Sequence, residues 1–133
     1  MTEHTEKYKA LPQNFFDQDV KIVARELLGC RLCMKSQLGK VKKQVISETE
    51  AYDGESDLAC HASKGRTKRT AVMYGESGHC YVYLCYGIHW LLNVVTGAKG
   101  YPAAVLIRGS EDHLGAGILH KALGVDGRLN GTL

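Results

Sequence analysis

Two alternating segments meet at a single glycine, and this arrangement limits the possible folds more than any other feature of the chain. Residues 79–86 and 88–96, on either side of Gly87, change side-chain character at every second position. A period of two is typical of β-strands, because successive side chains point to opposite faces of a sheet. Two such strands joined by a short glycine turn pair as an antiparallel hairpin. We therefore predict a fold built around antiparallel strands.

Further strands are predicted over 30–34 and 41–52, with a turn near Gly39 between them, and over 103–108. Residues 53–78 show no clean period and hold four glycines, scattered charge and His61. Loops of this length are uncommon in compact domains unless they carry function. We predict a long functional loop there, with a short helix near 70–74.

A helix is predicted before the first strand. One apolar face has helical spacing and consists of Val20, Val23, Ala24, Leu27 and Leu28. Asp17 or Asp19 can cap the start of this helix, and Gly29 can end it. A last short helix is expected over 118–123, ended by Gly124. Strands in sequence with helices outside them indicate an α+β fold, with a curved, largely antiparallel sheet and helices packed around it.

The length of 133 residues predicts a single domain over 1–133, with residues 1–12 as a flexible lead. The N-terminus lacks the apolar core of a signal peptide, and no apolar run approaches the ~20 residues of a membrane span. Five cysteines, an odd number, sit inside apolar runs. We expect a protein without membrane contact or structural disulfides, in the reducing cytoplasm and associated with the nucleoid if bacterial.

Two carboxylates share one face of the strand predicted over 41–52. In a continuous strand Glu48, Glu50 and Tyr52 lie on one face, and the opposite face carries Val45, Ser47 and Thr49. Glutamate is almost never fully buried unless it is paired. The face is therefore either an exposed acidic edge or the site of a general base. Glu50 is the favoured base because it lies nearer the loop.

Polar and aromatic residues on the later strands also need an explanation. Tyr83 and Tyr86 are either core residues or surface rings, and Tyr86, next to Gly87, could insert between base pairs as a wedge. Asn93 lies within an apolar strand, where a buried amide needs partners or reads a ligand edge. Arg108 ends an apolar strand, and its side chain likewise either bonds partners in the protein or contacts a ligand.

Cys30-Arg-Leu-Cys33 is the obvious candidate for a metal or redox site, but its spacing is against both. An offset of three puts the two sulfurs on opposite faces of a strand, and no second CxxC follows. Cys60-His61 and His79-Cys80 give no regular ligand spacing. No GxGxxG, P-loop, HExxH or GxSxG motif is present. We predict no metal and no cofactor.

The net charge of +3 is mild, but positive side chains cluster in two short segments. One cluster consists of Lys64, Arg66, Lys68 and Arg69, and the other of Lys35, Lys40, Lys42 and Lys43. Each cluster is either a solvated face or a surface that contacts phosphates.

The motifs, taken in order, resemble the alkyladenine (3-methyladenine) DNA glycosylase family. Residues 47–95 are similar to the family's ETEAY, acidic loop, histidine, Gly-Arg stretch and YVYxxYGxxxxxN block. LPQNFFDQDVKIVARELLG resembles its N-terminal segment, AAVLIRG its arginine-bearing strand, and LHKALGVDGRLNG its closing segment. The resemblance spans nearly the whole chain, which makes it far more specific than any single motif.

The resemblance implies a monofunctional base-excision repair enzyme that acts on double-stranded DNA. Such an enzyme flips an alkylated or deaminated purine, such as 3-methyladenine, 7-methylguanine or hypoxanthine, out of the duplex and hydrolyses its N-glycosidic bond. By motif position Glu50 would activate the attacking water, and Arg108 would help to place that water or a phosphate. No metal or cofactor is implied, and a monomer suffices.

The same resemblance implies roles for the remaining motif residues. Tyr52, His61 and Tyr83 would enclose the flipped base, and Asn93 would discriminate against guanine. Tyr86 would fill the gap left in the base stack. The DNA backbone would contact Lys64, Arg66, Lys68 and Arg69.

Relatives carry an extra segment after the arginine-bearing strand, which is missing here near 111–112, and they continue beyond Leu133. Gly115-Ala116-Gly117 stands where they usually have Gly-Pro-Gly. Because of these departures, a non-catalytic module that binds damaged DNA is the alternative hypothesis. A hydrolase of free nucleosides is a third, and the basic clusters argue against it.

Overall fold

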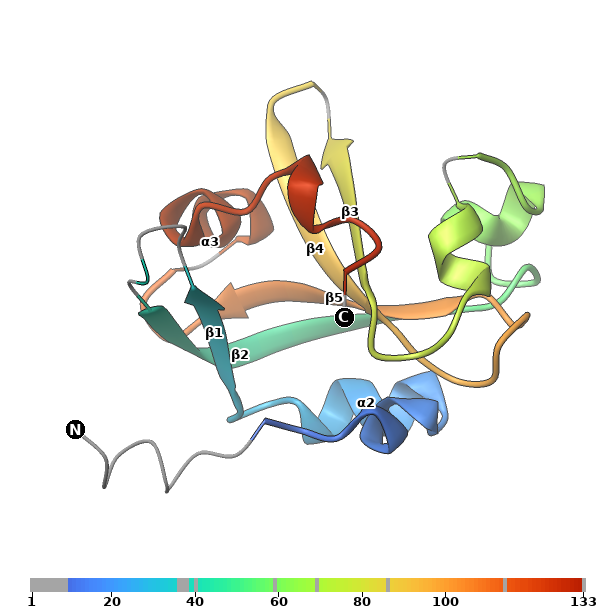
Figure 1. Cartoon of the computed structure of the whole chain (residues 1–133), viewed down its shortest axis with the longest axis horizontal. Helices are drawn as coiled ribbons and strands as arrows, with labels where there is room; N and C mark the ends of the chain where they lie inside the picture. The colour runs from blue at the N-terminus through green and yellow to red at the C-terminus, as the bar shows by residue number, and fades with distance from the viewer. Residues whose placement is uncertain are drawn as a thin grey trace.

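The computed structural model describes residues 10–35, 39, 41–58, 60–68, 70–85, 87–113 and 115–132, apart from the side chain of Lys64. Five strands form one antiparallel sheet in the order β1-β2-β5-β4-β3. Their bounds are β1 (Arg31–Lys35), β2 (Val41–Asp53), β3 (Cys80–Cys85), β4 (His89–Val95) and β5 (Ala103–Ser110). The predicted α+β fold with a curved antiparallel sheet is confirmed (Figure 1).

The predicted first helix is α2 (Val20–Glu26), and Asp19 caps it by accepting a hydrogen bond from the Lys21 backbone N–H at 2.8 Å. Leu28, placed on the apolar face in the sequence-based prediction, is 46% exposed, so that placement was wrong. The reason is local, because the helix ends at Glu26 and the chain then turns through Gly29, whose φ is +86°.

Short 3-10 helices complete the secondary structure. η1 (Gln13–Asp17) precedes α2, and η4 (Gly127–Leu129) follows the second α-helix, α3 (Ala116–Leu123). The long loop contains η2 (His61–Lys64) and η3 (Ala71–Tyr74). The short helix predicted near 70–74 is therefore confirmed, whereas η2 was not predicted.

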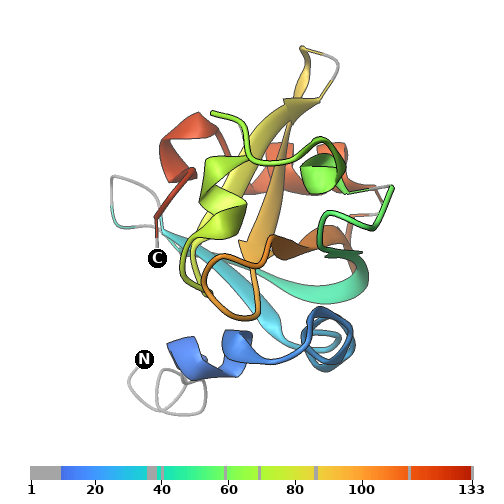
Figure 2. The same ribbon diagram turned by 90° about the vertical axis from the view of Figure 1, so that its right-hand side faces the viewer.

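The two faces of the sheet are covered by different parts of the chain. α2 packs on β2 and β5, and α3 packs on β4 and β5, so that both α-helices contribute to one core. The loop with η2 and η3 covers the other face, where a second buried cluster forms around Met73 and Tyr81. Figure 2 shows η2 and η3 in front of the strands, with α2 below the sheet. Four of the candidate residues, Tyr52, His61, Tyr83 and Asn93, lie on this second face.

A bulge in β2 determines which of its side chains face the loop. Ile46 pairs with Ser110 and Glu48 with Gly109, so Ser47 is an extra residue in the ladder. Ile46 is consequently buried in the helix-covered core, and beyond the bulge Thr49 bonds the Ala24 carbonyl of α2 at 2.8 Å. The predicted grouping of Val45 and Ser47 with Thr49 was wrong, because an unbroken period of two was assumed.

The β3–β4 hairpin projects from the body of the molecule (Figures 1 and 2). Leu84 and Ile88, near its tip, are 40% and 71% exposed. Tyr86 lies between them in the sequence, outside the described residues. The predicted hairpin thus exists and presents apolar side chains to solvent at its end.

Candidate active site

The pairing of the strands aligns residues that are far apart in the sequence. Tyr81 pairs with Asn93, Asn93 with Leu106, and Leu106 with Glu50. Directly paired residues point to the same face of a sheet. These side chains therefore form one row across β3, β4, β5 and β2, on the face covered by the loop.

Glu50 is held by two donors at this row's β2 end. The Tyr52 hydroxyl donates to Glu50 Oε1 at 2.5 Å, and Arg108 Nη1 lies 2.9 Å from Glu50 Oε2. Arg108 Nε is also 3.7 Å from Glu48 Oε2, so the guanidinium lies between two carboxylates. The Glu50 side chain remains 36% exposed, which leaves it accessible to water.

Tyr52 is a proton donor in this arrangement. Partial burial, and then its hydrogen bond to Glu50, raise the pKa of Tyr52 well above that of a free tyrosine. The phenol therefore stays protonated at neutral pH and donates to the carboxylate. Charge-assisted O–H···O⁻ bonds of this length are stronger than neutral ones.

Aromatic side chains surround a small cavity beside Glu50. The cavity encloses about 30 Å³ and is lined by Tyr52, His61, Met73, Tyr81, Tyr83 and Asn93. The His61 and Tyr83 rings lie 4.4 Å apart between centroids, tilted by 60°. His61 Nδ1 is 3.0 Å from the Tyr81 hydroxyl. The arrangement offers flat aromatic surfaces on which a heterocycle could stack.

Asn93 forms part of the cavity wall and is 2% exposed. Its Nδ2 donates to the Tyr81 carbonyl oxygen at 3.1 Å. This bond directs the amide across the strands, so a buried polar group lies at the cavity, as a group that reads a ligand edge would.

The loop that carries His61 is anchored at its start. Asp57 Oδ2 accepts from the Asp53 backbone N–H at 3.0 Å, and Asp57 O accepts from the Cys60 N–H at 2.9 Å. From the turn between β4 and β5, the Tyr101 hydroxyl donates to Asp53 Oδ1 at 2.7 Å. These contacts connect the end of β2 to Cys60, which is buried directly before His61.

The structure brings together six of the residues predicted from the sequence, namely Glu50, Tyr52, His61, Tyr83, Asn93 and Arg108. Sequence reasoning did not assign Tyr81 and Met73 to the site. Tyr81 could have been found, because it is two positions from Tyr83 on β3 and their side chains lie on the same face. Met73 gave none, because it lies in an aperiodic loop.

The predicted DNA contacts are only partly described. Tyr86, Arg69 and the side chain of Lys64 lie outside the described residues. Arg66 and Lys68 are exposed, and the Arg66 guanidinium lies 5.7 Å from the centroid of the Tyr74 ring. These two cations are on the same loop as His61, outside the cavity lining.

In the second basic cluster, Lys42 has a structural contact. Its Nζ donates to the Ala122 carbonyl oxygen at 3.1 Å, near the C-terminus of α3. A cation in this position satisfies a carbonyl that the helix leaves free. Lys42 of this cluster therefore connects the β1–β2 hairpin to α3.

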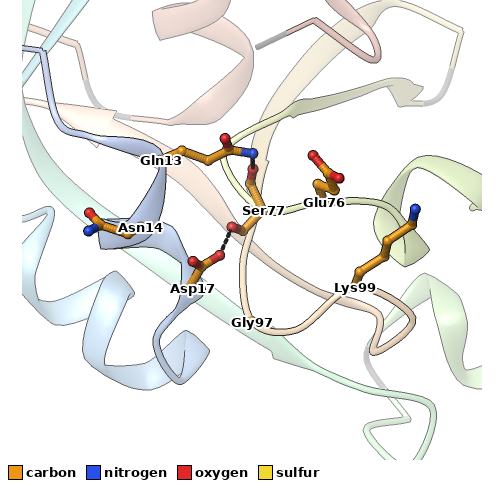
Figure 3. Close-up of a pocket in the computed structure, with 7 residues that line it drawn as sticks. All are labelled: Gln13, Asn14, Asp17, Glu76, Ser77, Gly97 and Lys99. Atoms are coloured by element: carbon orange, nitrogen blue, oxygen red, sulfur yellow. Dashed lines mark hydrogen bonds between the residues drawn. The ribbon is translucent and has the colours of Figure 1, made fainter.

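A wider hollow of about 440 Å³ lies elsewhere, between η1 and the turn after β4. Figure 3 shows the Gln13 amide donating to the Ser77 carbonyl oxygen and the Ser77 hydroxyl bonded to Asp17. These bonds tie the N-terminal segment to the end of the long loop. None of the residues predicted for the site lines this hollow, so we place the candidate site at the smaller cavity.

The cysteines do not form an alternative site in the described part of the chain. All five are free thiols, and burial raises the pKa of the Cys60 thiol, which disfavours its nucleophilic thiolate. Among the described residues, no group of three His, Cys, Asp or Glu side chains could hold a metal ion. The helices in the same ranges are too short or too polar to cross a membrane.

Comparison with known proteins identifies relatives of the chain. The methylpurine-DNA glycosylase (MPG) family profile matches residues 14–124. A protein of Rickettsia rickettsii (strain Sheila Smith) named "Putative 3-methyladenine DNA glycosylase" is 48% identical over 123 residues, covering 87% of this chain and 64% of the relative. Proteins with the same name from Methanocella arvoryzae and Legionella pneumophila (strain Lens) are 54% and 45% identical, over 76% and 92% of this chain. The chain spans 50% and 70% of their lengths.

Proposed function

The chain belongs to the methylpurine-DNA glycosylase family, as its motifs indicated, and we propose that it excises alkylated or deaminated purines from duplex DNA. The proposed substrates are 3-methyladenine, 7-methylguanine and hypoxanthine, and the reaction is hydrolysis of the N-glycosidic bond. One observation carries the proposal. A water-accessible carboxylate, oriented by Tyr52 and Arg108, lies beside a cavity walled by aromatic rings.

In the proposed reaction Glu50 is the general base. A water at its carboxylate transfers a proton to Glu50 as the oxygen attacks C1′ of the sugar, and the purine leaves with the electrons of the broken C–N bond. Arg108, 2.9 Å from Glu50 Oε2, keeps the carboxylate in one orientation. A positioned general base contributes typically ~10²–10⁴-fold to a rate. The mechanism uses no metal or cofactor.

The cavity would receive the flipped purine. Flipping costs a few kcal/mol and least for a damaged or mismatched base. Stacking on Tyr52, His61 and Tyr83 offsets that cost by ~1–3 kcal/mol per base. N-methylation makes 3-methyladenine and 7-methylguanine cationic, and a cation is further attracted by an aromatic face. Asn93 would disfavour unmodified guanine by its contact with the exocyclic 2-amino group, a cost that cationic 7-methylguanine offsets through its attraction to the aromatic faces.

The loop and the hairpin would contact the DNA around the flipped nucleotide. The exposed cations Arg66 and Lys68 are suited to phosphates, and we assign Lys64 and Arg69 to the same surface. Tyr86, which lies outside the described residues, would fill the space left in the base stack. We propose that the protein acts as a monomer on double-stranded DNA in the cytoplasm.

Single-turnover base release tests the proposal. The protein, in excess, is incubated with duplexes carrying hypoxanthine or 7-methylguanine, beside the variants Glu50→Gln and Glu48→Gln. We expect release by the wild type and a loss of at least ~100-fold in Glu50→Gln, with DNA binding kept. Glu48→Gln is the matched control, because Glu48 contacts Arg108 but not Tyr52, and its loss should be smaller. Full activity of Glu50→Gln would exclude Glu50 as the base.

The small cavity volume, about 30 Å³, supports a second candidate function. A non-catalytic module could recognise damaged or bent DNA with the same surface and never accommodate a purine in the cavity. It would bind lesion duplexes preferentially, in a salt-sensitive manner, and release no base. Clean turnover by the wild type would exclude it.

A further inference from the structure

Tyr52 belongs both to the wall of the aromatic cavity and to the hydrogen bonds of Glu50. Its side chain lines the cavity together with His61 and Tyr83. Its hydroxyl donates to Glu50 Oε1 at 2.5 Å. A displacement of this ring therefore widens the cavity and also breaks the hydrogen bond that Glu50 Oε1 accepts.

The cavity must widen before a purine can enter. Its volume of about 30 Å³ has room for about two water molecules, at ~10–15 Å³ for each, and not for a purine. A ring inserted between two aromatic faces needs them roughly 7 Å apart, twice the contact distance between carbon atoms. The His61 and Tyr83 centroids are 4.4 Å apart, so a flat base cannot enter between these two rings and has to stack beside them, against another wall of the cavity. The small volume leaves no room for it there until one wall moves.

The burial of the walls indicates which one moves. Met73, Tyr81 and Asn93 are each 2% exposed, and Asn93 is bonded to the Tyr81 backbone. His61 is held by the Tyr81 hydroxyl and by the anchored start of its loop. Tyr52 is only partly buried, and its hydroxyl is tied to the half-exposed site of Glu50 and Arg108. Tyr83 is also only partly buried, but its ring lies 4.4 Å from that of His61 and 5.5 Å from that of Tyr81. Tyr52 is therefore the wall that we expect to move.

We propose that Tyr52 couples entry of the flipped purine to the release of Glu50, an inference that rests on the proposed function. The entering base displaces the Tyr52 ring, and the hydroxyl leaves Glu50 Oε1. That oxygen is then open to a water proton, while Arg108 retains Oε2. Without a base in the cavity, Tyr52 occupies Oε1 and water is not activated there.

The variant Tyr52→Phe tests the coupling, because it keeps the ring and removes the hydrogen bond. In the wild type, binding of a flipped base has to break that bond, and in the variant it does not. A hydrogen bond to a charged group has a net value equivalent to roughly a ten- to hundredfold change in an equilibrium constant. We expect the half-saturating protein concentration for a hypoxanthine duplex to fall about tenfold, the lower end of that range, because the Glu50 side chain is 36% exposed. The gain in affinity should be confined to the damaged duplex, because undamaged DNA places no flipped base against Tyr52.

Tyr74→Phe is the matched control. The Tyr74 hydroxyl donates to Glu55 Oε2 at 2.6 Å, a bond of the same chemistry and nearly the same length, and Tyr74 does not line the cavity. We expect no change in half-saturation or maximal rate for this variant. An equal effect in both variants would overturn the proposal.

Two further results would overturn the coupling. If the maximal rate of Tyr52→Phe falls while half-saturation stays constant, the hydroxyl supports Glu50 in the reacting complex. If neither parameter changes, the bond is not broken on base entry. If the wild type releases no base from any damaged duplex, the proposed function fails. Direct binding then still tests the coupling, which predicts a gain in lesion affinity for Tyr52→Phe alone.

Discussion

Gly54→Ala should destabilise the protein in two separable ways. Gly54 has a φ of +82°, a conformation that costs an L-residue roughly 1–2 kcal/mol. A Cβ added at this position would lie 2.5 Å from the Tyr101 hydroxyl oxygen and 2.7 Å from the ring carbon that bears it. Real Cβ atoms do not approach other heavy atoms so closely, so the Tyr101 ring must move.

The second contribution follows from the displaced ring. Tyr101 is 46% exposed, so it can swing into solvent and avoid compression, but it then loses its 2.7 Å hydrogen bond to Asp53. That loss adds about 0.5–1 kcal/mol. We expect Gly54→Ala to lower the free energy of unfolding by roughly 1.5–3 kcal/mol in total.

Urea unfolding separates the backbone contribution from the loss of the Tyr101 hydrogen bond. It is measured for four proteins, namely the wild type, Gly54→Ala, Tyr101→Ala and the double variant. In the Tyr101→Ala background only the backbone strain remains, so Gly54→Ala should cost about 1–2 kcal/mol there. The difference between the two backgrounds is the coupling between the residues. An equal cost in both would refute the steric argument, and a cost of only a few tenths of a kcal/mol in the wild type would refute the backbone argument as well.

Two further predictions concern stability. Burial lowers the pKa of His120 to about 4 from an ordinary 6.5, so the unfolded chain binds more protons between these pH values. The free energy of unfolding should therefore fall by up to ~3 kcal/mol as the pH drops from 6.5 to 4. In His120→Gln, urea unfolding should show a weaker dependence of this free energy on pH. An equal pH dependence in both proteins would contradict the lowered pKa of His120. Asp19→Ala removes the acceptor that caps α2, and thermal or urea unfolding should show a loss of about 1 kcal/mol. Glu26→Ala, at the other end of α2, is the control, because it leaves the cap intact and should cost less. Asp17→Ala cannot serve as the control, because Asp17 is hydrogen-bonded to Ser77.

The sequence determined the features that depend on neighbouring residues. The period of two before and after Gly87 was sufficient for β3, β4 and the hairpin, because strand character is expressed locally. Asp19 and Gly124 marked helix ends for the same reason, through bonds and backbone conformations within a few residues. The order of the motifs also indicated the family.

Only the tertiary structure decided how these elements meet. The register that aligns Asn93 with Leu106 and Glu50 depends on hydrogen bonds between strands far apart in the sequence. The bulge at Ser47, which turns Ile46 into the helix-covered core, is a property of the β2–β5 pair and has no local signature in either strand. The Tyr52–Glu50–Arg108 contacts follow from that register. The residue types at the site could thus be read from the sequence, whereas their distances required the assembled sheet, because non-local pairing determines which side chains become neighbours.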